Sequence, residues 1–193
     1  MSRKKKITDQ EVLEAALKVI CEKGHSNFSL VDVSNEVGLS PATIIQRFKS
    51  KNELVLEAFK SFNKDFENHV TGSDYSDRSS ADALIDFIVE MSERFEVGQI
   101  GNQIELLMLD VVDPQMNKVA RDHFVLFRKK VKQIISEGLK SGEFRKENSA
   151  DDLVLLLEAF WIGVVIQWAI FKNGTMKSWV RSKTRIIVKQ WVK

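Results

Sequence analysis

Residues 40–54 read SPATIIQRFKSKNEL, and this stretch decides the fold. A serine followed by a proline is typical of a helix start. The Ser40 hydroxyl accepts a hydrogen bond from an otherwise unpaired backbone N–H, and Pro41 has no N–H to leave unpaired. Residues 50–53, Ser-Lys-Asn-Glu, have the pattern of a capping box, which marks the start of another helix. The stretch therefore predicts a short helix followed, almost without a loop, by a second one.

Two further helices are predicted before this stretch. The first begins after Thr8, where Thr-Asp-Gln-Glu forms another capping box, and it ends at Gly24. Its predicted inner face consists of Leu13, Ala16, Leu17 and Ile20. The second helix is capped by Ser29 and stopped by Gly38. Because only residues 38–40 separate the second helix from the third, the two are expected to cross at a steep angle.

The third helix is expected to have one inner and one outer side. With Ile44 and Phe48 facing inward, the outer side offers methyl groups, a hydroxyl and an amide, which are the groups that read base edges in a major groove. Nearby cations and helix N-termini are suited to phosphates. The candidate DNA contacts are Ser29, Ser40, Pro41, Ala42, Thr43, Ile45, Gln46, Arg47, Lys49 and Lys51. The basic residues 3–6, Arg-Lys-Lys-Lys, are interpreted as an arm on DNA phosphates.

The run EVLEAALKVICEKGHSNFSLVDVSNEVGLSPATIIQRFKSKNELVLEAF, residues 11–59, resembles the helix-turn-helix domain of the tetracycline-repressor (TetR) family. The resemblance implies a DNA-binding regulator whose remaining residues form a ligand-binding and dimerising domain. Two positions depart from the family pattern. Ile45 stands where the family usually has a tyrosine that meets a phosphate, and Arg47 stands where a histidine is frequent. Ile45 cannot donate a hydrogen bond, so it favours a thymine methyl instead.

Helical periodicity extends over nearly the whole chain. Its 193 residues are 44% hydrophobic and include only two prolines, so we predict an all-α fold of about nine helices. Three parts are expected: a DNA-binding domain at 1–51, a connecting helix at 52–70, and an effector-binding and dimerisation domain at 71–193. Residues 1–51 hold nine Lys and Arg against six Asp and Glu, and residues 172–193 hold seven against none. The acidic middle is interpreted as ordinary solvated helix faces.

Composition also limits the chemistry of the chain. Cys21 is the single cysteine, so no disulfide can form within one chain, and no spacing suggests a metal site. The basic start has no apolar signal region behind it, which favours a cytoplasmic protein. The three histidines lie far apart in sequence, and no nucleophile–base pair or phosphate loop is present. We therefore expect no enzyme and no cofactor.

Large apolar side chains after residue 80 exceed what a small core needs, and they are candidates for an effector cavity. The candidate ligand-binding residues are Phe87, Met91, Met108, Phe124, Phe127, Trp161 and Trp168. The alternative is that each is simply core. Polar residues among them, such as Glu105 and Glu158, are expected to orient a ligand.

Residues 153–171 are apolar on almost every side. A membrane span is one interpretation, but Glu158 and Gln167 would be costly in lipid. We prefer a helix buried between its own domain and a second copy, so that helices 150–171 and 175–192 form a homodimer interface without a membrane. The sequence thus predicts a homodimeric repressor on a palindromic operator, released by a small apolar effector. The alternatives are a helical interaction module that has lost specific DNA reading and a membrane-associated helical protein.

Overall fold

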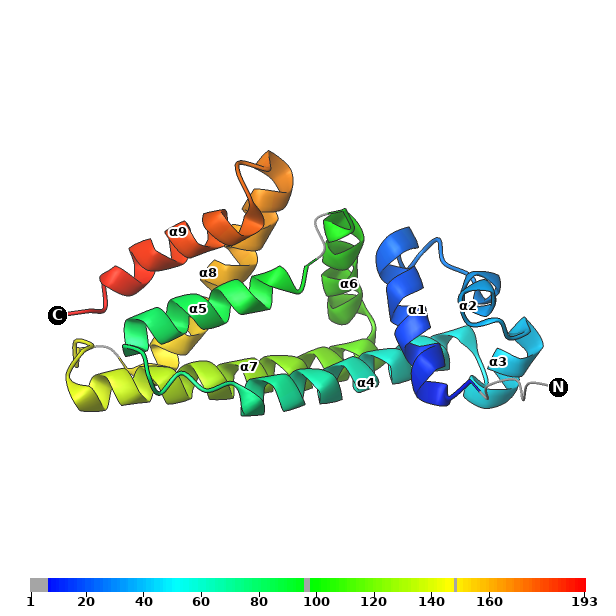
Figure 1. Ribbon diagram of the computed structural model, residues 1–193, viewed down its shortest axis with the longest axis horizontal. Coiled ribbons are helices and arrows are strands. Elements are labelled where there is room, and N and C mark those ends of the chain that lie inside the picture. Colours follow the sequence, from blue (N-terminus) through cyan, green and yellow to red (C-terminus); the bar gives the residue numbers. More distant parts are fainter. Residues whose placement is uncertain (1–6, 96–97, 148) are drawn as a thin grey trace. The chain divides into compact units, whose positions relative to one another are not determined.

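The computed structural model describes residues 7–95, 98–147 and 149–193. Within these ranges the chain forms nine helices, and no strand beyond one isolated antiparallel bridge between Phe144 and Val192. The helices are α1 (Asp9–Lys23), α2 (Leu30–Val37), α3 (Pro41–Phe48), α4 (Lys51–Gly72), α5 (Ser80–Glu93), α6 (Ile100–Val112), α7 (Pro114–Ser141), α8 (Ala150–Phe171) and α9 (Met176–Lys189) (Figure 1). The predicted all-α class and the helix count are confirmed.

The predicted helix ends are also present. Thr8 and Ser29 each form a capping box with the residue three positions on, and Ser40 and Ser149 cap α3 and α8. Gly38 follows α2 in the left-handed conformation, with φ of 70°. The helix predicted over residues 52–70 extends slightly further as α4, which ends at Gly72 and buries Val70 in its last turns.

The chain divides into two compact units. The first, called here the N-terminal unit, comprises the chain up to Glu67 together with Gly101–His123. The second, the C-terminal unit, comprises Asn68–Ile100 and Phe124–Lys193. The N-terminal unit thus takes in α6 and the start of α7. The functional division at residues 51 and 70 remains a prediction.

The core of the N-terminal unit lies among α1, α2, α3 and α4, where Ile20, Val33, Ile44 and Leu54 are fully buried. The inner face of α1 is rotated from the predicted one. Val12, Ala15, Ala16, Val19 and Ile20 are buried, whereas Leu13 and Leu17 are only partly buried. Leu106 of α6 and Val119 of α7 join the same core, which explains why these segments cluster with the N-terminal helices.

The core of the C-terminal unit is aromatic. The Phe127 ring stacks on Trp161 with centroids 5.0 Å apart, and it also meets Phe87 at 5.5 Å. The Trp161 Nε1–H donates to the Ser92 hydroxyl at 2.8 Å, so the indole nitrogen is satisfied inside the core. Gly138 allows close packing in this unit, because a Cβ there would overlap the Phe144 ring.

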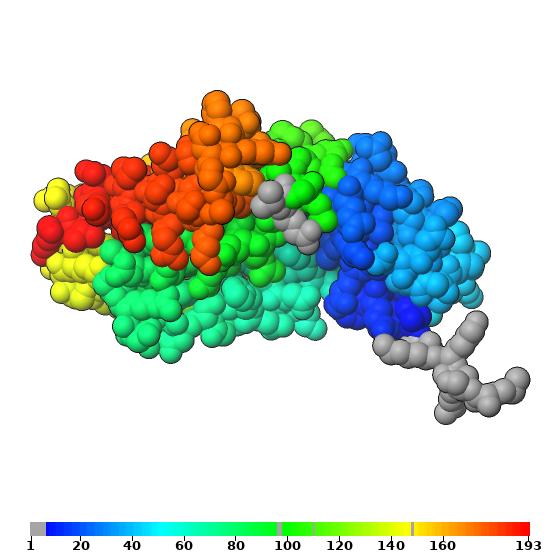
Figure 2. Space-filling view, turned by 45° about the horizontal axis from the view of Figure 1, so that its top comes forward, coloured from blue at the N-terminus to red at the C-terminus, as the bar shows by residue number. Residues whose placement is uncertain are grey.

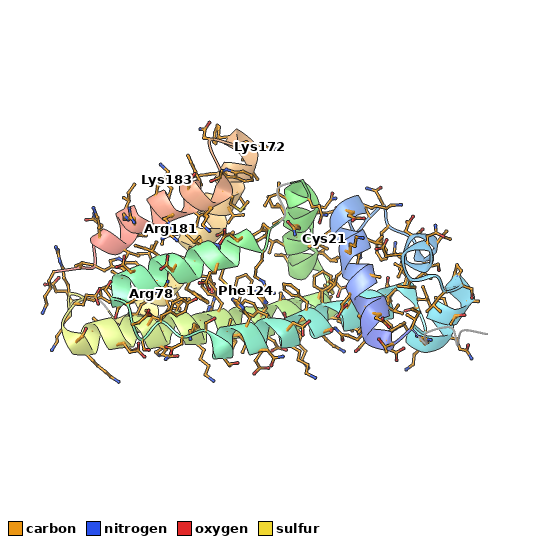
Figure 3. The ribbon with its side chains drawn as sticks, viewed as in Figure 1. Cys21, Arg78, Phe124, Lys172, Arg181 and Lys183 are labelled. Atoms are coloured by element: carbon orange, nitrogen blue, oxygen red, sulfur yellow. The ribbon has the colours of Figure 1, made fainter. Side chains whose placement is uncertain are left out.

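Helices α5 and α9 lie side by side in the C-terminal unit (Figures 1 and 2). Asp86 of α5 accepts a hydrogen bond from Arg78 and forms an ion pair with Arg181 at 2.7 Å, and Figure 3 labels both arginines. Lys177 of α9 also pairs with Glu93 at 2.8 Å. Two of the seven cations of residues 172–193 therefore serve to hold α9 on α5.

Helix α8 is apolar and only partly covered. It buries Val154 and Leu157, but Leu155 and Leu156 are about half exposed, and Ile170 and Phe171 are about two-thirds exposed. Among the described residues, this is the one helix long and apolar enough to cross a membrane, and 44% of its most apolar window is buried. Length and composition alone do not separate such a span from a helix of a soluble protein's core.

Glu158, the carboxylate in the apolar middle of α8, is paired. Arg128 of α7 donates to both Glu158 oxygens at 2.7 Å, and this hydrogen bonding raises the pKa of Arg128. The pair explains how a carboxylate is accommodated in a helix this apolar.

Candidate nucleic-acid interface

The corner between α2 and α3 is short and is held by backbone and side-chain hydrogen bonds. The N–H groups of Gly38 and Leu39 both donate to the Ser34 carbonyl, at 2.8 and 3.2 Å. Ser34 is buried, and its hydroxyl donates to the Leu30 carbonyl at 2.7 Å. Because Gly38 adopts the left-handed conformation, the helical backbone of α2 ends there and α3 begins as a separate short helix.

Helix α3 has the two sides that a reading helix needs. Ile44 is fully buried and Phe48 is 9% exposed, so they fix the helix on its support. The opposite side carries Pro41, Ala42, Ile45 and Gln46, all exposed, with Thr43 and Arg47 half-buried at its edges. The Thr43 hydroxyl lies 2.8 Å from the Ser40 hydroxyl. The outer side of α3 therefore presents small apolar groups and the exposed side-chain amide of Gln46.

The three cations near this side differ in their contacts. Lys49 is exposed and ends α3 with φ of 69°. Lys51 instead turns inward: its ammonium donates to the Phe28 carbonyl at 2.6 Å and lies 4.0 Å from the centre of the Phe28 ring. Arg47 donates through Nη1 to the Ile7 carbonyl at 3.0 Å and to Asp9 at 3.3 Å. Two cations that the sequence assigned to phosphates thus have bonds within their own domain.

The start of α2 already has an acceptor. The Ser29 hydroxyl donates to Asp32 at 2.7 Å, and the Ser29 N–H donates to the same carboxylate at 2.8 Å. Lys23 pairs with Asp32 as well, and its hydrogen bond is the largest cause that lowers the pKa of Asp32 to about 2. A phosphate at Ser29 would therefore meet a carboxylate beside the helix N-terminus.

The candidate ligand-binding residues fall into two groups. Phe87, Met91, Phe127, Trp161 and Trp168 are buried in the C-terminal unit, and Phe124 is half-buried there. Figure 3 labels Phe124 on α7. Met108 belongs to the other unit. It lies on α6 in the N-terminal unit and is 57% exposed, because Leu106 occupies the inner side of that helix.

Sequence reasoning missed the polar contacts between α6 and α1, which both belong to the N-terminal unit. The Asn102 amide donates to the carbonyls of Cys21 and Glu22 at 2.8 and 2.9 Å. Glu105, expected to orient a ligand, instead accepts a hydrogen bond from the Ser26 hydroxyl at 2.6 Å. Polar residues on an amphipathic helix carry no signal for such distant partners.

Comparison with known families decides the identity of the N-terminal part. Residues 12–58 match the family described as "Bacterial regulatory proteins, tetR family". The chain belongs to the TetR family. The matched segment covers α2 and α3 entirely, most of α1 and the start of α4, so the corner described above is the helix-turn-helix of this TetR-family protein.

Relatives extend the similarity over most of the chain. An uncharacterized HTH-type transcriptional regulator of Mycobacterium tuberculosis is 28% identical over 159 residues, covering 80% of this chain and 74% of its own. A putative transcriptional regulator from Saccharomonospora viridis, solved with choline, matches with a TM-score of 0.79 at 22% identity, covering 96% and 97% of the two chains. FadR from Bacillus subtilis, solved with stearoyl-CoA, matches with a TM-score of 0.70 at 15% identity. The match covers 92% of this chain and 96% of the FadR chain.

These relatives are transcriptional regulators rather than enzymes. Among the described residues no three His, Cys, Asp or Glu side chains gather into a group that could hold a metal ion. The protein is a TetR-family transcriptional regulator with a helix-turn-helix for DNA.

Proposed function

We propose that this regulator is a homodimeric, cytoplasmic repressor that binds a palindromic operator and is released by a small apolar effector. The outer side of α3 carries the proposal. Its exposed Pro41, Ala42, Ile45 and Gln46 belong to the same helix as the buried Ile44 and Phe48, so base-reading chemistry rests on a rigid support. Gln46 would pair with an adenine edge, and Ala42 and Ile45 would contact thymine methyls.

A second copy would complete the site. Helix α8 exposes four large apolar side chains to solvent: Leu155, Leu156, Ile170 and Phe171. A twofold-related partner would cover them. Helices 150–171 and 175–192 would form this interface, and each protomer would place one α3 in successive major grooves about one helical turn apart. The apolar side of α8 favours a protein partner over a lipid one, because Glu158 and Arg128 would be costly to insert into lipid.

The effector would bind in residues 71–193, beside Phe87, Met91, Phe124, Phe127, Trp161 and Trp168. The structural relatives solved with choline and with stearoyl-CoA support a small-molecule effector, and the aromatic lining supports an apolar one. Effector binding would change the separation of the two reading helices, and a small change in spacing costs affinity because half-sites are fixed by the DNA repeat.

Gln46→Ala tests the base-reading role. Genomic fragments bound by the unaltered protein would first be selected and footprinted. The substitution is expected to reduce the preference for the operator over random duplex by roughly 10- to 100-fold, because one bidentate base contact is worth about 1–3 kcal/mol. Binding to random duplex should stay unchanged, since it depends on phosphates. Gln133→Ala, which removes an exposed amide of α7, is the matched control.

The rival interpretation is a helical interaction module that has lost specific DNA reading. Ile45, 37% exposed where the family usually has a tyrosine, is the observation in its favour. If selection recovers no preferred fragment, this interpretation replaces the repressor. If it recovers one but Gln46→Ala keeps the full preference, the assignment of Gln46 is wrong and the repressor remains.

A further inference from the structure

Two polar side chains of α6 bond to the end of α1 and to the turn that follows it. The side-chain amide of Asn102 donates to the backbone carbonyls of Cys21 and Glu22 at 2.8 and 2.9 Å. The Glu105 carboxylate accepts a hydrogen bond from the Ser26 hydroxyl at 2.6 Å. Cys21, labelled in Figure 3, thus lies where α1 comes next to α6 within the N-terminal unit.

The bonds of Asn102 satisfy carbonyls at the end of α1. The last four carbonyls of a helix have no partner inside that helix. In α1, which ends at Lys23, the Ile20 carbonyl accepts from the Gly24 N–H, and the next two carbonyls accept from Asn102. A side-chain amide carries two N–H donors, so one asparagine can satisfy both. The end of α1 is therefore completed by a residue from another helix.

Gly24 allows α6 to come this close to the turn. It is buried and has φ of 84°, a conformation that side chains rarely adopt. A Cβ at this position would lie 2.8 Å from a Glu105 oxygen and 3.2 Å from the Asn102 side-chain oxygen. Leu106, next to Glu105, is buried in the core of the N-terminal unit. Apolar packing and polar contacts thus hold α6 against the same turn.

The turn at residues 24–28 joins α1 to the helix-turn-helix and is attached at both of its ends. At the far end Phe28 is 2% exposed, and its carbonyl accepts from Lys51 of α4 at 2.6 Å. Ser29, the next residue, caps α2. At the near end the attachment comes from α6. Because α2 begins directly after the turn, the position of the turn affects the direction in which α2 and α3 leave α1.

We propose that Asn102 and Glu105 are positioning residues for DNA binding: by holding the turn at residues 24–28, they fix the helix-turn-helix in the orientation that reads an operator. Neither needs to contact DNA. Both lie outside residues 12–58, the segment that matches the TetR family, although they belong to the same compact unit. This inference rests on the proposed DNA-binding function, and it gives Glu105 a role different from the ligand contact that the sequence suggested.

Asn102→Ala in the full-length protein removes both bonds at the end of α1 and should have the largest effect. If the loosened turn leaves each helix-turn-helix correctly oriented about one-third of the time, a dimer that uses two of them binds its operator about 10-fold more weakly. Binding to random duplex should change by less than about 2-fold, because it depends on phosphate contacts rather than on base reading. Fluorescence anisotropy with a selected operator and with random duplex measures both.

The contrast between the two DNAs separates positioning from folding. A general loss of folded protein would weaken binding to operator and random duplex equally, and that result would overturn the proposal. An unchanged operator affinity in Asn102→Ala would overturn it as well. Gln115→Ala, which removes an exposed amide of α7 in the same unit, is the matched control and should change neither affinity.

A pair of substitutions at Glu105 isolates the hydrogen bond from the charge. Glu105→Ala and Glu105→Gln remove the same negative charge, but only glutamine keeps an oxygen that can accept from Ser26. Loss of a carboxylate near DNA by itself strengthens binding, and to the same extent in both variants. The proposal expects Glu105→Ala to bind the operator about 3- to 5-fold more weakly than Glu105→Gln, since only alanine loosens the turn. Equal operator affinities of the two variants would overturn the role of Glu105.

Amide hydrogen exchange supplies a readout without DNA. The N–H groups of Asn27 and Phe28 donate to the Gly24 carbonyl at 3.2 and 3.1 Å, so their exchange reports opening of the turn. In Asn102→Ala these two amides should exchange about 10-fold faster, whereas amides in the middle of α1 should keep their rates. Faster exchange throughout the unit would mean that the substitution only destabilises the fold, which contradicts a positioning role.

The outcomes also separate this inference from the proposed function. If the unaltered protein selects an operator and the Asn102 and Glu105 variants bind it equally well, the inference is overturned and the repressor remains. An unaltered protein that binds no DNA would overturn both.

Discussion

Helices α3 and α8 each expose one side to solvent, but the two exposed sides have opposite chemistry. The outer side of α3 offers an amide, a hydroxyl at its edge and small apolar groups. The exposed side of α8 offers Leu155, Leu156, Ile170 and Phe171. Both helices are anchored by buried neighbours, so the difference lies in the partner that each side suits. A polar, hydrated surface such as a DNA groove suits α3, and an apolar protein surface suits α8.

The comparison also separates local from distant determinants. Helix α3 is bounded by Ser40 and by a turn whose signals are adjacent in sequence. In α8 no side is polar enough to indicate an orientation, and its burial depends on α5, α7 and α9. Glu158 of α8 illustrates this dependence, because its carboxylate accepts hydrogen bonds from Arg128, thirty residues earlier in the sequence.

The largest expected effect comes from making the exposed side of α8 charged. Leu155→Glu together with Leu156→Glu should convert a dimer to monomers, because the interface would bury four unpaired carboxylates. Operator affinity should then fall at least about 100-fold, since linked half-site contacts are worth a factor of about 10² to 10⁴. Sedimentation equilibrium and gel shift measure the two effects.

The control for this prediction places the same charges on another exposed apolar side. Val111 and Val112 of α6 are 73% and 75% exposed, and replacing both with glutamate should leave the oligomeric state unchanged. If the α8 variant still sediments as a dimer, α8 is not the interface, and its exposed side needs another explanation.

The next effect concerns the aromatic core that supports α8. Phe127→Ala should lower the free energy of unfolding by about 3–5 kcal/mol, because Phe127 is fully buried and stacks on Trp161. Denaturant unfolding at one fixed protomer concentration measures it. Val125→Ala, two residues earlier on α7 and 60% exposed, should change it by less than about 0.5 kcal/mol. A decrease below about 1 kcal/mol for Phe127→Ala would instead favour Phe127 as the wall of an effector cavity.

Much of the fold could be predicted from sequence because its signals are local. Ser29, Gly38 and Ser40 each mark a helix end within four residues of the groups that they bond, and all three predictions are confirmed. The sequence did not predict the inner face of α1 correctly, because Val12 and Leu13 are neighbours and equally apolar. Only the packing of the N-terminal core decides that Val12 is fully buried and Leu13 only partly.

The candidate site was predictable in outline but not in its contacts. The pattern of α3 separates Ile44 and Phe48 from Gln46 because helical period alone assigns the two sides. It cannot say that Arg47 bonds to Ile7, forty residues earlier, or that Lys51 bonds to the Phe28 carbonyl. Such contacts depend on where distant backbone carbonyls lie, and a carbonyl has no residue-specific signal in the sequence.

The smallest expected effect lies at the start of α2, where a carboxylate supports the corner between α2 and α3. Hydrogen bonds from Lys23 and then from Ser29 lower the pKa of Asp32 from 3.8 to about 2. Because the folded-state pKa lies below the unfolded one, the charged carboxylate stabilises the fold above about pH 3.8. This contribution is lost as the pH falls through the interval toward about 2.

Asp32→Asn should therefore flatten the fall in melting temperature across that interval, while lowering the melting temperature slightly at neutral pH. Lys23→Met should give part of the same flattening, because the Lys23 hydrogen bond is the largest cause of the low pKa. Asn35→Ala, an exposed neutral position on the same helix, should keep the pH profile of the unaltered protein. Thermal unfolding followed by circular dichroism at closely spaced pH values measures all three. An unaltered profile in Asp32→Asn would mean that this corner is held by packing alone, as the aromatic core beneath α8 is, and the contrast between the two regions would lose its electrostatic part.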